Sequence, residues 1–165
     1  MYLPDTPIVF ELRKARAGQA DPGLTAWAAG TARERLFLSA ISLVDLETAV
    51  AKTARNDKAA GAALRGWRDN QVVPAFDGHV LPLDAPVARR RGELAIADTR
   101  VALFAATALE HGLTLVTRDK QAFKGARVRL FDPSGYQPSE AEDDADWRTA
   151  GRSGSLWLRN LFIRG

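Results

Sequence analysis

The sequence predicts an α/β domain with a mostly parallel sheet, and two observations lead to this prediction. The 165 residues are enough for one compact domain, and the 46% of apolar residues can build a buried core. Along the chain, short apolar runs of strand length alternate with longer segments of helical pattern. This alternation is typical of domains in which helices connect parallel strands and cover the sheet.

Short apolar runs are the predicted strands, and helices are predicted between them. The strands are expected at Met1–Leu3, Leu36–Ala40, His79–Leu83, Leu113–Thr117 and Val128–Phe131. The helices are expected at Ile8–Arg16, Leu24–Thr31, Ser42–Val50, Pro86–Glu93 and Thr99–His111, with a helical hairpin over Asn56–Asn70.

Start and stop signals mark several of these helices. Pro7 stands at the start of the first helix, which is a favourable place for proline because the N–H there has no helical partner. Ser42 and Asp45 have the spacing of a capping box. Gly112 directly follows the last predicted helix, a common position for glycine at a helix end.

Composition and charge exclude several classes of function. A net charge of +3 and a pI of about 9.6 tolerate a polyanionic partner without requiring one. The chain has no cysteine, which excludes a disulfide framework, a thiolate zinc site and a cysteine nucleophile, and suits the cytoplasm. The N-terminal segment does not have the pattern of a signal peptide. No run of about 18 apolar residues is long enough for a membrane span.

A change in composition divides the chain near residue 135. Residues 133–146 read PSGYQPSEAEDDAD, a turn-rich acidic linker, and residues 151–165 read GRSGSLWLRNLFIRG, a short amphipathic piece. We therefore expect one domain over residues 1–135 and a tail over residues 136–165. The tail could fold back on the domain, contact a partner or be a non-native extension.

Aspartates near the ends of the predicted strands are the residues most suited to chemistry. Asp5 ends the first strand, Asp45 follows the second, Asp119 follows the fourth, and Asp98 precedes the last predicted helix. Because ligands of α/β sheets bind at the carboxyl ends of the strands, these acids are expected to meet there. Hard oxygen ligands select Mg²⁺ or Mn²⁺, which activates water and stabilises charge on a phosphodiester.

Each of these acids also has a purely structural explanation. Asp5 and Asp98 each precede a helix and could be its N-cap. Asp45 could complete the capping box with Ser42, and Asp119 could be only a loop residue after a strand. The spacing of the acids does not choose between these alternatives, and it names no substrate.

Several blocks of the sequence resemble VapC-family PIN domains. MYLPDTPIVFELRK is similar to the start of the family, LFLSAISLVDLETAV to its second block, and ALFAATALEHGLTLVTRDKQAF to its third and fourth. HVLPLDAPVA also matches, and VRLFDP is similar to the closing strand. The likeness covers residues 1 to about 135 in family order. It implies a PIN-like three-layer α/β/α fold with a mostly parallel five-stranded sheet.

The resemblance also implies a function. In the family, a small set of acids binds Mg²⁺ or Mn²⁺ for endoribonuclease cleavage of RNA, and a cognate antitoxin protein holds the toxin inactive. Carried over to this sequence, the catalytic acids are Asp5, Asp45, Asp98 and Asp119, and the metal ligands among them are Asp5, Asp98 and Asp119. The supporting residues are Thr6 and Thr117. Family members commonly dimerise, so a homodimer is expected.

The sequence departs from the family pattern at two of the acids. Asp45 stands where the family usually has glutamate, so its carboxylate reaches one methylene less far. Glu47 does not replace it, because two residues along a helix turn a side chain by about 200°. Val101 stands at the position of the third acid, and Asp98 lies three residues before it, on nearly the same helix face.

These departures keep more than one function open. The first hypothesis is a metal-dependent endoribonuclease toxin. The second is a catalytically impaired PIN domain that acts as an antitoxin-binding or dimerisation module, which Val101 and Pro7 motivate because Pro7 replaces a polar family asparagine. Phe10 also replaces a small polar residue and adds bulk near the first acid. A third hypothesis is a PIN nuclease acting in RNA processing or on DNA.

Overall fold

Within residues 1–138, the strands all pair in parallel. The computed structural model describes residues 1–138, apart from the side chain of Arg16. The strands are β1 (Tyr2–Pro4), β2 (Leu38–Ser39), β3 (Val80–Leu81), β4 (Thr114–Val116) and β5 (Arg129–Phe131). They form two hydrogen-bonded groups, β1-β4-β5 and β2-β3, which a single parallel bridge between Tyr2 and Leu36 connects. The predicted five strands are therefore present, with the sheet nearly interrupted between β1 and β2.

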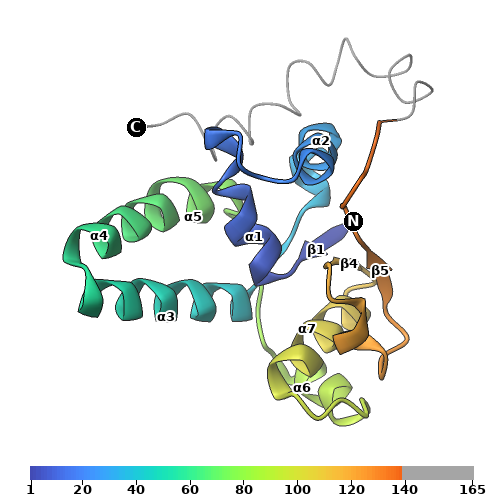
Figure 1. The fold of residues 1–165 in the computed structure, drawn as a ribbon. Coiled ribbons are helices and arrows are strands. Elements are labelled where there is room, and N and C mark those ends of the chain that lie inside the picture. The colour runs from blue at the N-terminus through green and yellow to red at the C-terminus, as the bar shows by residue number, and fades with distance from the viewer. Residues whose placement is uncertain (139–165) are drawn as a thin grey trace.

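Helices cover both faces of these strands (Figure 1). They are α1 (Thr6–Leu12), α2 (Pro22–Gly30), α3 (Ala40–Asn56), α4 (Lys58–Trp67), α5 (Val73–Ala75), α6 (Ala85–Gly92) and α7 (Thr99–Glu110). The 3₁₀ turns are Ala15–Ala17, Arg33–Arg35 and Lys120–Phe123, and a π-helical turn spans Arg68–Val72. Figure 1 shows α3, α4 and α5 on one side of the strands, and α6 and α7 on the other.

Adjacent residues of β4 divide the core into two clusters, since neighbouring strand side chains point to opposite faces. Val116 joins a buried cluster built mainly by α1, α2, α3 and α4, whereas Leu115 joins one built mainly by α7 with Leu3 of β1. Both leucines and Val116 are fully buried. The protein therefore has the three-layer α/β/α architecture that the sequence predicts.

The first helix and the third differ from their predicted bounds. α1 starts at Thr6 and stops at Leu12, short of the predicted end at Arg16. It stops there because the N–H of Lys14 donates to the carbonyl of Glu11, three residues back, at 2.8 Å. α3 starts at Ala40, and its N-cap is Ser39, whose hydroxyl accepts from the N–H of Ile41 at 3.2 Å. The capping box predicted for Ser42 and Asp45 is therefore wrong.

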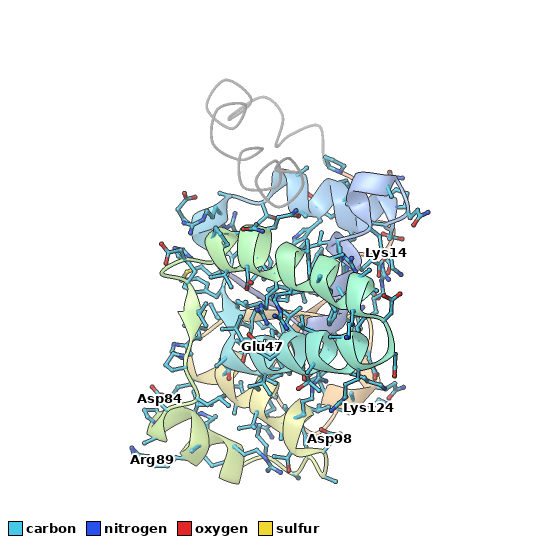
Figure 2. The ribbon with its side chains drawn as sticks, turned by 90° about the vertical axis from the view of Figure 1, so that its left-hand side faces the viewer. Lys14, Glu47, Asp84, Arg89, Asp98 and Lys124 are labelled. Atoms are coloured by element: carbon cyan, nitrogen blue, oxygen red, sulfur yellow. The ribbon has the colours of Figure 1, made fainter. Side chains whose placement is uncertain are left out.

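Other predicted features are present, one of them displaced. α7 runs from Thr99 to Glu110 and is followed by Gly112, whose φ of 63° lies in the left-handed region that favours glycine. The helical hairpin predicted over Asn56–Asn70 is displaced: α3 runs on to Asn56, the chain turns at Asp57, and α3 and α4 form the hairpin and lie side by side (Figure 2). Within residues 1–138, no helix is long and apolar enough to cross a membrane. The predicted acidic linker and amphipathic tail lie outside the described residues from position 139 onward.

Candidate active site

Asp5 lies directly after β1 and begins α1. Its backbone N–H donates to the carbonyl oxygen of Val116 at 3.0 Å, which extends the pairing of β1 with β4. Its carboxylate is the N-cap of α1 and accepts from the N–H of Ile8 at 3.0 Å. Asp5 is only 7% exposed, and this burial raises the pKa of its carboxyl, while a hydrogen bond from Thr117 acts in the opposite direction. A buried carboxyl at a strand end is typical of a functional site.

Thr117 connects Asp5 with Asp119. It follows β4, is fully buried, and donates its N–H to the carbonyl of Phe131 at 2.9 Å. Its hydroxyl donates to Asp5 and accepts from the N–H of Asp119 at 3.1 Å. Asp119 is exposed, caps a 3₁₀ turn through the N–H of Ala122 at 3.1 Å, and contributes to the raised pKa of Asp5 through its charge. The ends of β1 and β4 therefore bring Asp5 and Asp119 together.

Asp45 lies on α3, within reach of the start of α1. Thr6, the first residue of α1, donates its hydroxyl to the Asp45 carboxylate and lies 3.2 Å from the Ser42 hydroxyl. Thr6 and Ser42 are buried, whereas Asp45 is half-buried. Thr6 therefore orients an acid that stands 39 residues further along the chain.

A cation lies among these acids. Arg100, the second residue of α7, donates from Nε to both carboxylate oxygens of Asp45, at 3.0 and 2.9 Å, and from Nη2 to one of them. Hydrogen bonding to Asp45, together with the charges of Asp45, Asp5 and Asp98, raises the pKa of Arg100. The guanidinium also lies 5.3 Å from the ring centroid of Phe104. Three acids therefore act on one positive group.

Asp98 and Val101 stand at the start of α7. Asp98 is exposed and is the N-cap of this helix, accepting from the N–H of Val101 at 2.9 Å. The Val101 side chain packs against the hydrophobic cluster that contains Leu3 and Phe104. Since a valine supplies no metal donor, α7 offers the site only Asp98 and the guanidinium of Arg100.

The acids suit a divalent metal ion in chemistry and charge. Within residues 1–138, no three or more histidine, cysteine, aspartate or glutamate side chains lie close enough together to hold a metal ion. The donors are nevertheless all hard oxygens, which Mg²⁺ and Mn²⁺ prefer. Arg100 is a stand-in cation within the field of Asp5, Asp45 and Asp98. The donor atoms therefore have the right chemistry for a divalent ion, but in this structure they do not lie close enough together to hold one, and Arg100 pairs with Asp45.

Two residues near the first acids are directed elsewhere. The Glu47 side chain is 64% exposed and pairs with Arg68, so it points away from the acids as its helix position predicts. Phe10 stacks on Trp67, with ring centroids 5.8 Å apart and an interplanar angle of 29°. The bulk that Phe10 adds therefore lies in the contact between α1 and α4.

The basic residues of α6 do not gather at the acids. Arg90 pairs with two glutamates, and Arg91 donates to backbone carbonyls of the segment that follows α6. Arg89 is exposed, and Figure 2 shows it on the opposite side of the view from Asp98. The basic run of α6 is therefore mostly a solvated helix face, and Arg91 also stabilises the loop that follows the helix.

Comparison with known proteins agrees with this arrangement. Residues 2–128 match the family described as the PIN domain. The chain belongs to the PIN-domain family. It is 33% identical over 144 residues to "Toxin FitB" of Neisseria gonorrhoeae, covering 81% of this chain and 98% of that relative. It is 30% identical over 142 residues to "VapC ribonuclease Y4jK" of Sinorhizobium fredii, covering 81% of this chain and 97% of that relative.

Solved structures have the same PIN fold. FitAcB from Neisseria gonorrhoeae superposes with a TM-score of 0.72 at 30% identity, over 81% of this chain and 98% of that chain. FitAB bound to an IR36 DNA fragment gives a TM-score of 0.72 at 28% identity, over 85% of this chain and 100% of that chain. The family resemblance and the PIN-like fold predicted from the sequence are confirmed.

Arg100 is the residue of this PIN-domain site that the sequence analysis missed. One signal was available, because Arg100 lies in the first turn of a helix. The helix macrodipole favours acids there and opposes cations. Arg100 therefore stands against the helix dipole, and its pairing with Asp45 offsets this in the fold.

Proposed function

We propose that this chain is a metal-dependent endoribonuclease toxin of a type II toxin–antitoxin pair, acting in the cytoplasm. The observation that carries the proposal is the meeting of Asp5 and Asp119 at the ends of neighbouring strands, joined by the buried Thr117. Relatives named as a toxin and as a VapC ribonuclease, at 33% and 30% identity, support the activity.

The proposed metal ion is Mg²⁺ or Mn²⁺, and its ligands would be Asp5, Asp98 and Asp119. A divalent ion bound there would lower the pKa of water and stabilise the charge that develops on the phosphodiester. Asp45 would lie beside these ligands as the fourth acid. The chain itself supplies their orientation, since Thr117 and a backbone N–H fix Asp5, and Thr6 fixes Asp45.

The test compares Asp5→Asn with Asp84→Asn. Asp84 is a matched control because it caps α6 through the N–H of Val87 at 3.1 Å, and it lies across the view from Asp98 (Figure 2). With purified protein, RNA and Mg²⁺, D5N should lose at least about 100-fold in cleavage, the loss expected when charge stabilisation by a metal fails. D84N should cleave like the wild type, and undiminished cleavage by D5N would contradict the proposal.

A protein partner and a second copy complete the proposed system. The relative named Toxin FitB, at 33% identity, and the solved FitAcB and FitAB assemblies, at 30% and 28%, support a cognate antitoxin. We also expect a homodimer, which light scattering of the purified protein tests. A PIN nuclease working in RNA processing or on DNA would need no antitoxin, so a stable complex with a co-expressed antitoxin argues against that alternative.

A catalytically impaired PIN domain that binds an antitoxin or dimerises is the second candidate. Val101 at the third acid position and the pairing of Arg100 with Asp45 favour it. Wild-type protein that neither binds Mn²⁺ nor cleaves RNA, yet still forms the complex or the dimer, would establish this second function in place of the first.

A further inference from the structure

Two arginines stand where the strands begin, at the end of the sheet opposite to the acids. Arg129 is the first residue of β5, and the parallel register places it in one row with Thr114 and Tyr2. Arg35 stands at the Tyr2 end of this row, since its guanidinium lies 5.5 Å from the centroid of the Tyr2 ring. The candidate acids follow the other ends of β1 and β4, so the two arginines lie apart from the candidate active site.

Both arginines are exposed and lack an acidic partner. Arg129 donates to the backbone carbonyl of Gly112, and Arg35 lies over the Tyr2 ring. Neither forms an ion pair with a residue in the described range 1–138, although the exposed Glu34 directly precedes Arg35. This end of the domain therefore carries positive charge that is not paired within that range.

The described part of the chain ends beside these arginines. The ring of Tyr136 meets Phe131 edge-on at 6.2 Å, and the ring of Phe131 lies 6.2 Å from that of Tyr2. Since side chains two residues apart on a strand share a face, Arg129 lies on the same side of β5 as Phe131. In Figure 1, the last described residues pass the N-terminal end of β1. The chain beyond residue 138 therefore starts close to both arginines.

The segment that follows carries the opposite charge. Residues 140–146 read EAEDDAD, with five carboxylates and no basic residue. Glu140 comes four residues after Tyr136, and four residues of extended chain span at most about 14 Å. A segment attached so near to a surface has a high effective concentration there. Charge and reach therefore favour residues 140–146 as the partner of the two arginines.

We propose that residues 140–146 dock on Arg35 and Arg129 of the same chain, and that this contact neutralises the end of the sheet where the strands begin. The acidic segment then covers a basic surface of its own domain. Exposed ion pairs are individually weak and are screened by salt, so several charges hold the contact and it opens at high ionic strength. The proposal does not depend on metal binding or on RNA cleavage.

A spin label on the acidic segment tests the contact in the full chain. The chain has no cysteine, so Asp144→Cys provides a single attachment site. The label should broaden the amide resonances of Tyr2 and Thr114. In Arg35→Gln/Arg129→Gln, the ratio of docked to undocked segment should fall about threefold or more, the factor that two exposed ion pairs contribute. Salt at about 0.5 M should reduce the broadening in the same way, because it screens exposed charges.

Lys52→Gln/Arg55→Gln is the matched control. It removes the same charge from two exposed positions of α3 and leaves the arginines of the sheet in place. The labelled K52Q/R55Q protein should show the same broadening as the labelled protein without these substitutions. Equal broadening in R35Q/R129Q and K52Q/R55Q would overturn the proposal, because attachment to residue 138 would then be sufficient to bring the label near the sheet.

Nucleic acid is the other polyanion that this basic surface could bind, and the same variants distinguish it. The affinity for a fluorescently labelled single-stranded RNA is measured by anisotropy, with EDTA present to prevent cleavage. If residues 140–146 cover the arginines, RNA affinity should fall no more in R35Q/R129Q than in K52Q/R55Q. A larger loss in R35Q/R129Q would mean that the arginines are open to nucleic acid in the full chain, and it would overturn the proposal.

Discussion

The hydroxyl of Thr117 accepts a hydrogen bond from the backbone N–H of Asp119 at 3.1 Å. The same hydroxyl donates to the carboxylate of Asp5, so one buried group joins acids that follow two different strands. Since the parallel register pairs Pro4 with Val116, both chain segments leave the sheet at the same level. Because the two strands end at the same level, Thr117 can contact both Asp5 and Asp119, which are candidate metal ligands.

Replacing Thr117 by valine should weaken both stability and metal binding. Valine keeps the shape but leaves the N–H of Asp119 unpaired, which costs about 1–2 kcal/mol in the free energy of unfolding. Mn²⁺ affinity, measured by calorimetry, should fall about tenfold, because Asp5 and Asp119 lose their common partner. Thr117→Ser should restore most of the unfolding free energy and most of the Mn²⁺ affinity. Thr48→Val is the control, since the exposed Thr48 hydroxyl bonds only within its own helix; a T117V protein that matches T48V in both measurements contradicts the prediction.

Local patterns were sufficient to predict most of the fold. α7 is bounded by Asp98 and Gly112 within one residue of the expected range, because a cap and a left-handed glycine act within one turn. The start of α3 was mispredicted because Ser39 and Ser42 are equally good caps in isolation. Only the fold decides between them, by placing Ser42 in a buried contact with Thr6.

The part of the site that strand ends position could be predicted from the sequence. The part that depends on pairs of residues far apart in the chain could not. Asp5 and Asp119 could be expected to meet because parallel strands end at the same edge. Asp45 and Arg100 are 55 residues apart, and their pairing depends on how α3 packs near α7. No periodicity in the sequence carries that information, so the pairing of Arg100 with Asp45 appeared only in the structure.

Glu11 should make the stability of the protein depend on pH. Glu11, on α1, pairs with Arg118 in the segment that carries Asp119, and a hydrogen bond from Arg118 lowers the pKa of Glu11 below its ordinary value of 4.5. An acid with a lowered folded pKa stabilises the fold above the ordinary value and loses that stabilisation as the pH falls through the folded value. Glu11→Gln should therefore cost about 1 kcal/mol at pH 7.

Urea unfolding of the wild type and of E11Q at several pH values checks this dependence. The two proteins should converge as the pH falls from 4.5 through the lower pKa that Glu11 has in the folded protein, because wild-type Glu11 is neutral below that value. Glu93→Gln is the control, since the Glu93 side chain is 62% exposed where it pairs with Arg90. A difference between E11Q and the wild type that does not change with pH would show that the charge of Glu11 is not responsible.

Two glycines of α4 should respond in opposite directions to alanine. A Cβ at Gly61 would lie 2.5 Å from both Cα and Cβ of Ala54, so α3 and α4 could not keep their present approach. Gly61→Ala should therefore cost about 1–3 kcal/mol. A Cβ at Gly66 would meet only Nδ2 of Asn70 at 3.8 Å, and Gly66→Ala should stabilise the helix by about 0.5–1 kcal/mol. Thermal unfolding of the two variants tests both signs, and a stabilised G61A would mean that the hairpin is packed more loosely than described.

The end of the domain should lie after Tyr136 rather than at residue 135. The Tyr136 ring meets Phe131 edge-on, with centroids 6.2 Å apart, and the Tyr136 N–H donates to the carbonyl of Pro133 at 3.1 Å. The same segment packs so closely on Gly23 that an added Cβ would lie 2.5 Å from the Tyr136 nitrogen. A chain ending at residue 138 should keep the packing of this segment, whereas one ending at residue 135 should lose about 1 kcal/mol in unfolding free energy, the contribution of one aromatic pair.

Urea unfolding of the two truncated chains measures this difference, and Tyr136→Ala in the full chain is its matched control. If the ring is responsible, two losses of unfolding free energy should be similar. One is the loss of Y136A relative to the unsubstituted full chain, and the other is the loss of the chain ending at residue 135 relative to the chain ending at residue 138. Equal stability of the two truncated chains would place the boundary at residue 135. It would also mean that the contact of Tyr136 with Phe131 adds nothing measurable to the unfolding free energy. Loss in the shorter chain alone, with Y136A unaffected, would instead assign the stabilisation to the backbone turn that follows Pro133.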